Sequence, residues 1–254
     1  MTILDDFQLI NHKFDSKPFI NIYPIGDVHI GSKECDVSLF KEWIETVKQD
    51  PFGYAVVIGD MMNMGLKNSK TNVYEETLSP MEQKELCYEL LNPIADKILA
   101  GCSGNHEYRS VKECGMNPLY DVFCRMRIED RYRENACFIK LTVGKQGKNP
   151  NTYGVVLTHG SSKNKDEKWT YGVDGCDCFI SGHTHLGTHQ PLGKIRMDLT
   201  HNKVKTVGYQ HIVVMPFQSY GGYAIREKYM PNHLGQFQRI TFDGNSKRVG
   251  YTYY

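Results

Sequence analysis

The sequence predicts an α/β fold in which two packed β-sheets are flanked by helices. Strands and helices alternate through the first half of the chain, and the second half holds several short strands with no long helix between them. Alternation favours an α/β architecture, and the later run of strands favours a second sheet. Because no internal repeat or long low-complexity linker divides the 254 residues, we expect a single domain over residues 1–254.

The first strand–helix–strand unit is clearly marked. The apolar run Phe19–Ile25 predicts a strand, and apolar residues at helical spacing predict a helix over Val37–Gln49, with Asp36 placed to cap it. A second apolar strand is expected at residues 54–58. An acidic residue follows each strand, at the edge of the sheet where ligands bind in open α/β folds.

The remaining elements follow from local signals. Ser79-Pro80-Met81-Glu82 predicts a helix that starts with a capping box and has proline at its first position. An apolar stretch through Ile98 then leads into Gly104. Residues 108–135 form the least regular part, with helical spacing only at 118–126. Strands are expected at 137–143, 153–157, 178–180, 194–199, 203–207, 211–215, 238–242 and 249–253.

Composition and charge set mild bounds. The chain is 40% hydrophobic and 23% charged, with a formal net charge of +1, so global charge neither favours nor opposes a nucleic-acid partner. No apolar stretch approaches the length of a membrane span and the N-terminus lacks a signal-peptide pattern, so we expect a cytoplasmic protein without a membrane partner. The eight cysteines are then most simply free thiols.

Five short fragments carry metal-binding residue types, each at or just after the end of an apolar run. They are, in chain order, Asp27-x-His29, Gly59-Asp60, Gly104-Asn105-His106-Glu107, Thr158-His159-Gly160 and Gly182-His183-Thr184-His185. In isolation each has a plain structural alternative, such as a helix cap for the aspartate of the second fragment. The Asp-x-His and His-x-His spacings, however, place both side chains on one side of an extended backbone. Nitrogen and oxygen ligands presented from successive strand ends suit a two-metal hydrolytic site.

This ordered set resembles the calcineurin-like metallophosphoesterase superfamily. The resemblance implies a four-layer α/β/β/α sandwich of two mixed β-sheets, with a dinuclear centre at the strand ends. It also implies His106 as the catalytic residue, which contacts the phosphate and protonates the leaving oxygen after attack by a metal-bridging hydroxide. By matching position, the resemblance implies that Asp27, His29 and His185 bind the first metal ion and that Asn105, His159 and His183 bind the second. Asp60 is implied as the ligand that bridges the two ions. Mn²⁺ is the first choice for both ions, and Fe, Zn or Ni suit the ligand set nearly as well.

Neighbouring positions depart from the protein Ser/Thr phosphatase branch. There the second fragment extends to Gly-Asp-x-x-Asp-Arg, and an arginine precedes Gly-Asn-His-Glu; here Asn63, Met64 and Ser103 stand in those places. Two arginines that clamp a phosphomonoester dianion are therefore missing. Asn63 is able to orient the catalytic histidine but brings no negative charge to it. Arg109 is a candidate for one phosphate contact, with a solvated loop residue as the alternative.

We therefore expect a metal-dependent phosphodiesterase with DNA or RNA as the leading substrate, and small diesters such as cyclic nucleotides as a further class. The alternatives are a phosphomonoesterase acting on a small molecule or a phosphoprotein, and a non-catalytic scaffold. With its compact length and asparagine at position 63, the chain is similar to phage- or prophage-encoded metallophosphoesterases. It is also similar to the catalytic domain of DNA-repair nucleases of the superfamily.

Side chains that could bind nucleic acid are less specific. Base stacking is assigned first to Tyr220 and Tyr223 in a glycine-rich turn, and next to Tyr153 and Tyr171. Basic candidates for tracking a phosphate backbone are Lys67, Lys70, Arg125, Arg127, Arg131, Arg133, Lys163, Lys165 and Lys168. Acidic residues are interleaved with them, which favours solvated loops as the alternative.

Overall fold

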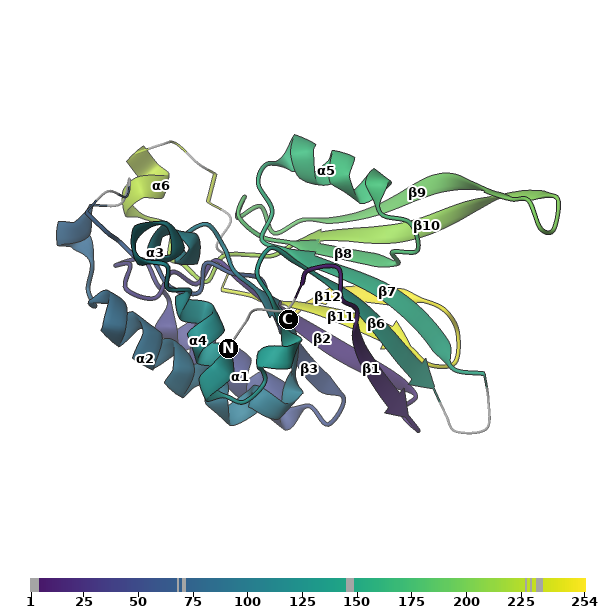
Figure 1. Ribbon diagram of the computed structural model, residues 1–254, viewed down its shortest axis with the longest axis horizontal. Coiled ribbons are helices and arrows are strands. Elements are labelled where there is room, and N and C mark those ends of the chain that lie inside the picture. Colours follow the sequence, from purple (N-terminus) through teal and green to yellow (C-terminus); the bar gives the residue numbers. More distant parts are fainter. Residues whose placement is uncertain are drawn as a thin grey trace.

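The structure is a computed structural model that describes residues 5–67, 69, 72–144, 149–226, 228, 230–231 and 235–254, apart from the side chains of residues 163 and 223. Two six-stranded sheets pack face to face, and helices lie on the outer face of each (Figure 1). This confirms the predicted four-layer α/β/β/α sandwich. No helix in the described part of the chain is long and apolar enough to cross a membrane.

The first sheet contains the predicted strand–helix–strand unit. Its order is β12-β11-β2-β3-β4-β5, in which β2 to β5 run parallel and β11 joins β2 antiparallel. The strands are β2 (Phe19–Ile25), β3 (Gly53–Val57), β4 (Ile98–Cys102), β5 (Tyr132–Arg133), β11 (Gln238–Asp243) and β12 (Val249–Tyr253). Parallel pairing places the carboxyl ends of β2, β3 and β4 at one edge of the sheet.

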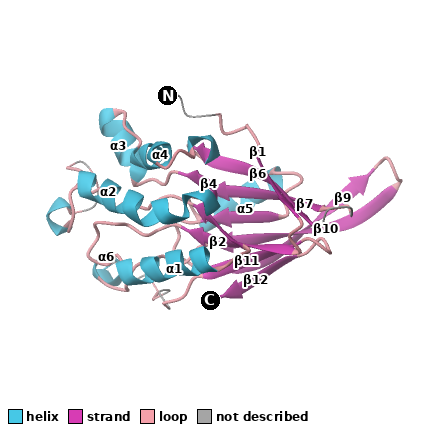
Figure 2. Ribbon diagram, turned by 90° about the horizontal axis from the view of Figure 1, so that it is seen from below, coloured by secondary structure: helices cyan, strands magenta, loops and turns pink. Residues whose placement is uncertain are grey.

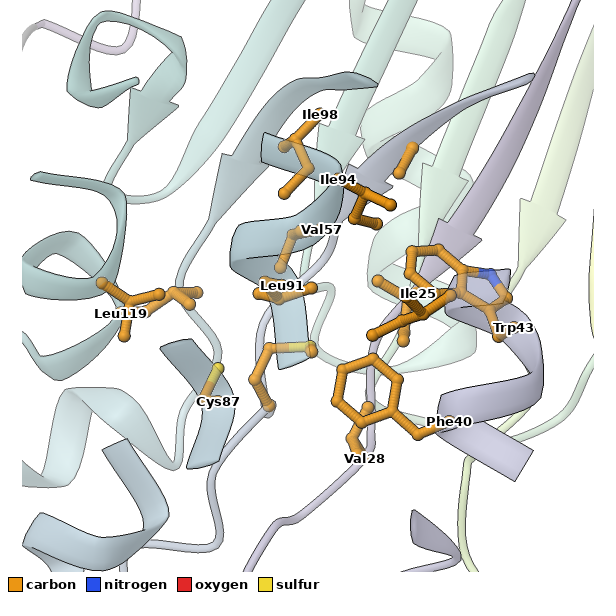
Figure 3. Packing of buried hydrophobic residues seen from close by; sticks show 14 of the residues in the cluster. Ile25, Val28, Phe40, Trp43, Val57, Cys87, Leu91, Ile94, Ile98 and Leu119 are labelled. Carbon is orange, nitrogen blue, oxygen red and sulfur yellow. The ribbon is translucent and has the colours of Figure 1, made fainter. Parts of the chain in front are cut away.

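Three helices cover the outer face of this sheet. They are α1 (Val37–Gln49), α2 (Pro80–Leu91) and α4 (Pro118–Arg125). Phe40 and Trp43 from α1 pack over Ile25, while Leu91 comes from α2 and Leu119 from α4 (Figure 3). All five side chains are fully buried, so the predicted apolar faces of these helices form the core of the outer layer.

The helix starts follow the predicted capping signals. The Asp36 carboxylate accepts the N–H of Leu39 at 2.9 Å, at the start of α1. At the start of α2, the Ser79 hydroxyl accepts the N–H of Glu82 and the Glu82 carboxylate accepts the N–H of Ser79. Both helix predictions are therefore confirmed at their first turns.

The second sheet has the order β1-β6-β7-β8-β10-β9. Its strands are β1 (Ile10–Asp15), β6 (Ala136–Gly144), β7 (Asn151–Thr158), β8 (Cys178–Ser181), β9 (His189–Asp198) and β10 (Lys203–Val213). Its inner face packs on the first sheet through residues such as Leu141, Val155 and Ile212. Helix α5 (Lys163–Gly172) covers the outer face, where Trp169 meets Phe179 with ring centroids 5.3 Å apart. Figure 2, seen from below, shows α1 and α2 in front of the strands.

Several elements lie outside the predicted set. Strand β1, which pairs in parallel with β6, was not predicted, and neither were α3 (Glu107–Cys114) and α5. The polar sequence of α5 explains the omission, because its buried positions include Asp166 and Thr170. Strand β10 is continuous where two strands were predicted, since Gly208 pairs with Gly193 inside the ladder. The shorter elements are β5 and α6 (Gly222–Arg226), and the 3₁₀ turns η1 (Val73–Glu75), η2 (Asn92–Lys97) and η3 (Glu129–Arg131).

Asp50, which follows α1, gives a pH-dependent prediction. Its carboxylate accepts hydrogen bonds from the Asn21 amide, the Tyr23 hydroxyl and the Phe52 N–H at 2.7–2.9 Å. Burial raises the pKa of Asp50, but these hydrogen bonds outweigh it and hold the pKa below its usual range. The folded pKa is depressed, so this stability is present above the unfolded value of about 4 and is lost as pH falls through the folded value.

We therefore expect Asp50→Asn to lower the free energy of unfolding at pH 7, with a difference from wild type that shrinks as the pH falls below about 4. Urea unfolding of both proteins across this range measures the difference. Asp15→Asn, which removes an exposed carboxylate on β1, is the control. A difference that stays constant with pH would contradict the assigned role.

Candidate metal centre

The five sequence fragments meet at one edge of the sandwich. From the first sheet, Asp27 and His29 follow β2, Asp60 follows β3, and Asn105 and His106 follow β4. From the second sheet, His159 follows β7, and His183 and His185 follow β8. The carboxyl ends of parallel strands from both sheets therefore supply every residue of the predicted centre.

The backbone of these loops is unusual. Five of the proposed ligands adopt the left-handed conformation, with φ between +48° and +68°. They are Asp27, His29, Asp60, His183 and His185. Non-glycine residues in this region cost free energy, which the surrounding structure must supply. Such strain concentrates at functional sites, where it aims side chains that an ordinary turn would direct elsewhere.

Two glycines allow the loops after β3 and β4 to touch. A Cβ on Gly59, whose φ is +74°, would overlap the main-chain nitrogen of Gly104. A Cβ on Gly104 would in turn overlap the Asp60 carboxylate. Glycine is therefore required at both positions to bring Asp60 beside Asn105 and His106.

One half of the centre forms around Asp27. Its fully buried carboxylate lies 3.3 Å from Nε2 of His185 and accepts the main-chain N–H of His183 at 2.9 Å. The imidazole of His29 lies beside this pair, with its ring centroid 5.4 Å from that of His185. Ligand atoms of Asp27, His29 and His185 all lie within 4.8 Å of one another, so the three are able to hold one ion.

The other half forms around Asp60. Its Oδ2 atom lies 3.1 Å from Nε2 of His159, and Asp60, His159 and His183 form a second group within 4.8 Å. The Asn105 amide oxygen lies 3.1 Å from Nε2 of His159 and 2.8 Å from Nδ1 of His183. Oδ2 of Asp60 also lies 3.9 Å from Nε2 of His29. The Asp60 carboxylate thus faces both halves, as a bridging ligand must.

The donor set fits divalent cations. Both ring nitrogens of His29 are buried and have no hydrogen-bond partner among the described residues. Burial of an imidazole whose nitrogens have no partner costs free energy, unless a metal ion or another ligand binds to them. His159 donates its Nδ1–H to the Ile58 carbonyl at 2.8 Å, which turns Nε2 toward the centre. Such a second bond fixes the tautomer and orientation of a metal-binding histidine.

Electrostatics favour the same conclusion. Burial raises the pKa of Asp60, but the nearby His159 and His106 outweigh it and hold the pKa well below its usual range. Burial lowers the pKa of His29 well below its usual value, so this ring is neutral. Ionised carboxylates and neutral imidazoles are the forms that bind metals.

His159 carries the balancing charge. Burial lowers its pKa, but the Asp60 carboxylate, by charge and hydrogen bond, raises it to about 10. A positive charge is therefore favoured beside Asp60, and a bound cation would supply it in place of this imidazolium.

A family model described as calcineurin-like phosphoesterase matches residues 20–205, which include all seven proposed ligands and His106. The chain belongs to this family. Metal-dependent phosphoester hydrolysis is thus the chemistry that the family and the centre support, and the chain is a hydrolase of this class. The resemblance found in the sequence is confirmed.

Several solved structures match the chain at low sequence identity. Vps29 of Entamoeba histolytica with Zn²⁺ is 13% identical, with a TM-score of 0.45 over 92% of this chain and 98% of that one. The phosphoesterase YfkN of Bacillus subtilis is 12% identical, with a TM-score of 0.43 over 93% and 90%. The NAD nucleotidase NadN of Haemophilus influenzae is 9% identical, with a TM-score of 0.44 over 93% and 49%. No curated protein matches the chain.

The surroundings of His106 differ from the sequence interpretation. Its Nδ1–H donates to the main-chain carbonyl of Asn63 at 2.7 Å, whereas the Asn63 side chain donates to Glu76. Position 63 therefore orients His106 through its backbone, and not through the amide that the sequence suggested. Burial lowers the pKa of His106 to about 4; the nearby Asp60 opposes this shift and Arg109 reinforces it.

Arg109 does reach the phosphoesterase centre. Its guanidinium donates to the Asn63 carbonyl at 2.9 Å and lies 3.0 Å from Nε2 of His106. Met64 and Ser103, at the two positions where a protein phosphatase has arginine, are buried, and the Ser103 hydroxyl bonds to Asn117 and Tyr132. Arg109 thus lies against His106, and is not the solvated loop residue that was the alternative.

The tyrosines predicted to stack on bases differ in their exposure to solvent. Tyr220 is 41% exposed in the segment after β10, and Tyr223 lies in α6, with its side chain outside the described part of the structure. Tyr171 is exposed on α5. The prediction for Tyr153 is wrong, because this ring is fully buried and its hydroxyl donates to the Asp243 carbonyl at 2.6 Å.

Three of the four arginine candidates in the irregular segment have structural roles. Arg131 donates to the carbonyl of Ile98, Arg133 is buried and donates to that of Asp130, and Arg125 pairs with Glu85 at 2.7 Å. Their interpretation as a phosphate-tracking loop is therefore wrong. The remaining basic candidates are Lys67 and Arg127, Lys163, Lys165 and Lys168 on α5, and Lys70, which lies outside the described residues.

Glu107 is the functional residue that sequence reasoning missed. Its buried carboxylate accepts the N–H groups of Asp60 and Gly104 on Oε2 at 2.9 Å and that of Met62 on Oε1 at 3.1 Å. It therefore clamps the loop after β3 to the loop after β4. The sequence did offer one indication, because Glu107 is the last residue of the Gly104-Asn105-His106-Glu107 fragment that carries the family resemblance.

We expect Glu107→Gln to weaken the metal centre. The glutamine NH₂ group must replace one oxygen, so at least one main-chain N–H loses its acceptor, at a cost of about 1–3 kcal/mol in the free energy of unfolding. Displacement of Asp60 should lower metal affinity by roughly 10- to 100-fold. Calorimetric metal titration and thermal unfolding measure the two effects. The exposed Glu113→Gln on the same helix is the control, and equal losses in both variants would contradict the clamp.

Proposed function

We propose that this protein is a dinuclear-metal phosphodiesterase whose leading substrate is nucleic acid. Asp27, His29 and His185 would hold one ion, Asn105, His159 and His183 the other, and Asp60 would be shared. Two divalent ions, with Mn²⁺ favoured and Fe, Zn or Ni suitable, supply Lewis acidity and lower the pKa of water at the reacting phosphorus. The free thiols of all eight cysteines fit a reducing compartment such as the cytoplasm.

One observation carries the preference for diesters. Arg109 is in contact with His106, whereas the two positions that hold arginine in protein phosphatases are the buried Met64 and Ser103. A phosphomonoester dianion favours bidentate clamping by several guanidinium groups, and a diester carries a single negative charge. One arginine beside the two ions is sufficient to orient that charge.

His106 and Arg109 converge on the same place. His106 is held by its Nδ1–H bond to Asn63, so its Nε2 atom faces the centre, 3.7 Å from Oδ2 of Asp60. Arg109 lies 3.0 Å from the same nitrogen. We assign Arg109 to a non-bridging oxygen of the phosphate. When its guanidinium turns from Nε2 of His106 to the phosphate, that nitrogen would be free to carry a proton, which it would give to the leaving oxygen.

Nucleic acid is favoured by an exposed aromatic side chain near the centre. The chain before Tyr220 contacts the loop after β2: the N–H of Phe217 donates to the Asp27 carbonyl at 3.1 Å, and that of Ser219 donates to the Glu34 carbonyl at 2.7 Å. These bonds hold the segment that leads to Tyr220 against the loop that carries Asp27, and a base stacked on this ring would direct its phosphate toward the ions. Exposed Lys165 and Lys168 follow the His159 loop on α5 and supply positive charge.

A substrate panel tests the class of ester. With Mn²⁺, we expect turnover of bis-p-nitrophenyl phosphate and single-stranded DNA well above that of p-nitrophenyl phosphate. EDTA should abolish this activity and added Mn²⁺ should restore it. A preference for p-nitrophenyl phosphate would reject the diester proposal in favour of a phosphomonoesterase.

Two variants test the assigned roles. His106→Ala should lose most turnover while it retains bound metal, and Arg109→Gln should lower kcat/KM for the diester by about 10- to 100-fold, the effect of one lost charged hydrogen bond. Lys112→Gln, an exposed change on the same helix as Arg109, is the control. Unchanged turnover in His106→Ala would reject the assigned role of His106, and a metal-loaded wild type without turnover would point to a scaffold.

A further inference from the structure

The β9–β10 ribbon extends beyond the rest of its sheet. These strands pair antiparallel from Lys203↔Asp198 to Ile212↔His189, whereas β8 pairs with β10 only over Gln210–Val213. We call residues 193–208 the ribbon arm. Figure 1 shows it projecting past the end of the sandwich, opposite the helices of the first layer. An isolated two-stranded ribbon is marginally stable in water unless another layer covers it.

One face of the ribbon arm is apolar and exposed. The exposed fractions are 78% for Ile195, 70% for Met197 and 71% for Val204, and 80% for Leu199 in the adjoining turn. Met197 pairs with Val204 across the ladder, and Ile195 lies two residues along β9, so their side chains share a face. By the same alternation Val204 points to the side of the sheet on which Ile212 is fully buried. The inner face of the sheet thus continues into the arm, beyond the cover of the first sheet.

The opposite face of the ribbon arm is charged and already partnered. Lys194 donates to the Val173 carbonyl at 2.9 Å beside the end of α5, and Arg196 pairs with Asp174 at 3.5 Å. Lys205 pairs with Asp198 at 3.4 Å. This face is anchored near α5, so the apolar face is the one that lacks a layer.

We propose that the apolar face of the ribbon arm binds the same face of a second copy of this chain. A twofold interface requires a self-complementary surface, and an uncharged apolar face meets its own copy without repulsion. The two ribbons would stack as facing sheets, about 10 Å apart. Nucleic acid is the less suitable occupant, because the lysines and arginine of the arm lie on the opposite face.

The size of the patch agrees with a dimer. At these exposures the four side chains present on the order of 500 Å² of apolar surface, within the upper range of the largest patch on a typical monomer. Two copies would then bury roughly 1,000 Å² in total, which reaches the lower limit for a specific interface. We therefore expect a reversible dimer with a dissociation constant on the order of 10 μM.

Sedimentation velocity of the full chain over a range of concentrations tests this proposal. Wild type should shift from monomer to dimer, and Met197→Glu should weaken the association by at least about 10-fold because a carboxylate would be buried at the contact. Lys203→Glu, on the opposite face of the same arm, is the matched control and should dimerise like wild type. Phosphodiesterase turnover should be equal in all three, because the arm contributes no residue to the metal centre.

Three outcomes would overturn the proposal. The first is a wild type that stays monomeric at about 100 μM, roughly 10-fold above the expected dissociation constant. The second is equal weakening by both substitutions, which would place the contact elsewhere. Hydrogen exchange of wild type provides a measurement without substitution: amides of residues 193–208 should exchange more slowly as protein concentration rises. The third is hydrogen exchange in the ribbon arm that does not depend on protein concentration, which would reject the proposed dimer.

Discussion

The burial of the Asp60 carboxylate is the constraint on which the rest of the centre depends. An ionised carboxylate in a sandwich edge is costly unless opposite charge and hydrogen bonds surround it. Here His159, His106 and His29 approach its Oδ2 atom, and the N–H of His106 donates to its Oδ1 atom. The left-handed loops, the paired glycines and the Glu107 clamp all serve to bring these groups to one buried charge.

The same centre joins the two sheets. His159, from the second sheet, donates to the carbonyl of Ile58 in the first, and the N–H of His183 donates to Asp27. Both bonds cross from β7 or β8 to the loops after β3 or β2. Apolar packing holds the sheets together along their length, and polar bonds set their relative position at the edge that holds the candidate metal centre.

The sequence was most informative where one physical rule acts locally. Capping signals at Asp36 and Ser79 predicted helix starts, and apolar runs predicted the strands that present the ligands. The sequence was least informative where tertiary contacts determine whether a helix or strand forms. Helix α5 has a polar sequence that is stabilised by packing, and β1 forms through pairing with a distant strand. At the centre, residue types indicated the proposed ligands, which the structure brings together. The clamp by Glu107 and the internal bonds of Arg131 and Arg133 depend on distant neighbours that no local pattern predicts.

Two imidazoles of the centre take their orientation from main-chain oxygen atoms, His159 from Ile58 and His106 from Asn63. A main-chain acceptor persists whatever side chain the residue carries. The side chain at position 63 can therefore differ without a change in the tautomer of His106, provided that the backbone of the loop keeps its path. Asparagine can therefore stand at the position that is aspartate in the protein Ser/Thr phosphatase pattern. The course of the backbone sets the ring orientation of His106, and the Asn63 side chain is free to donate to Glu76.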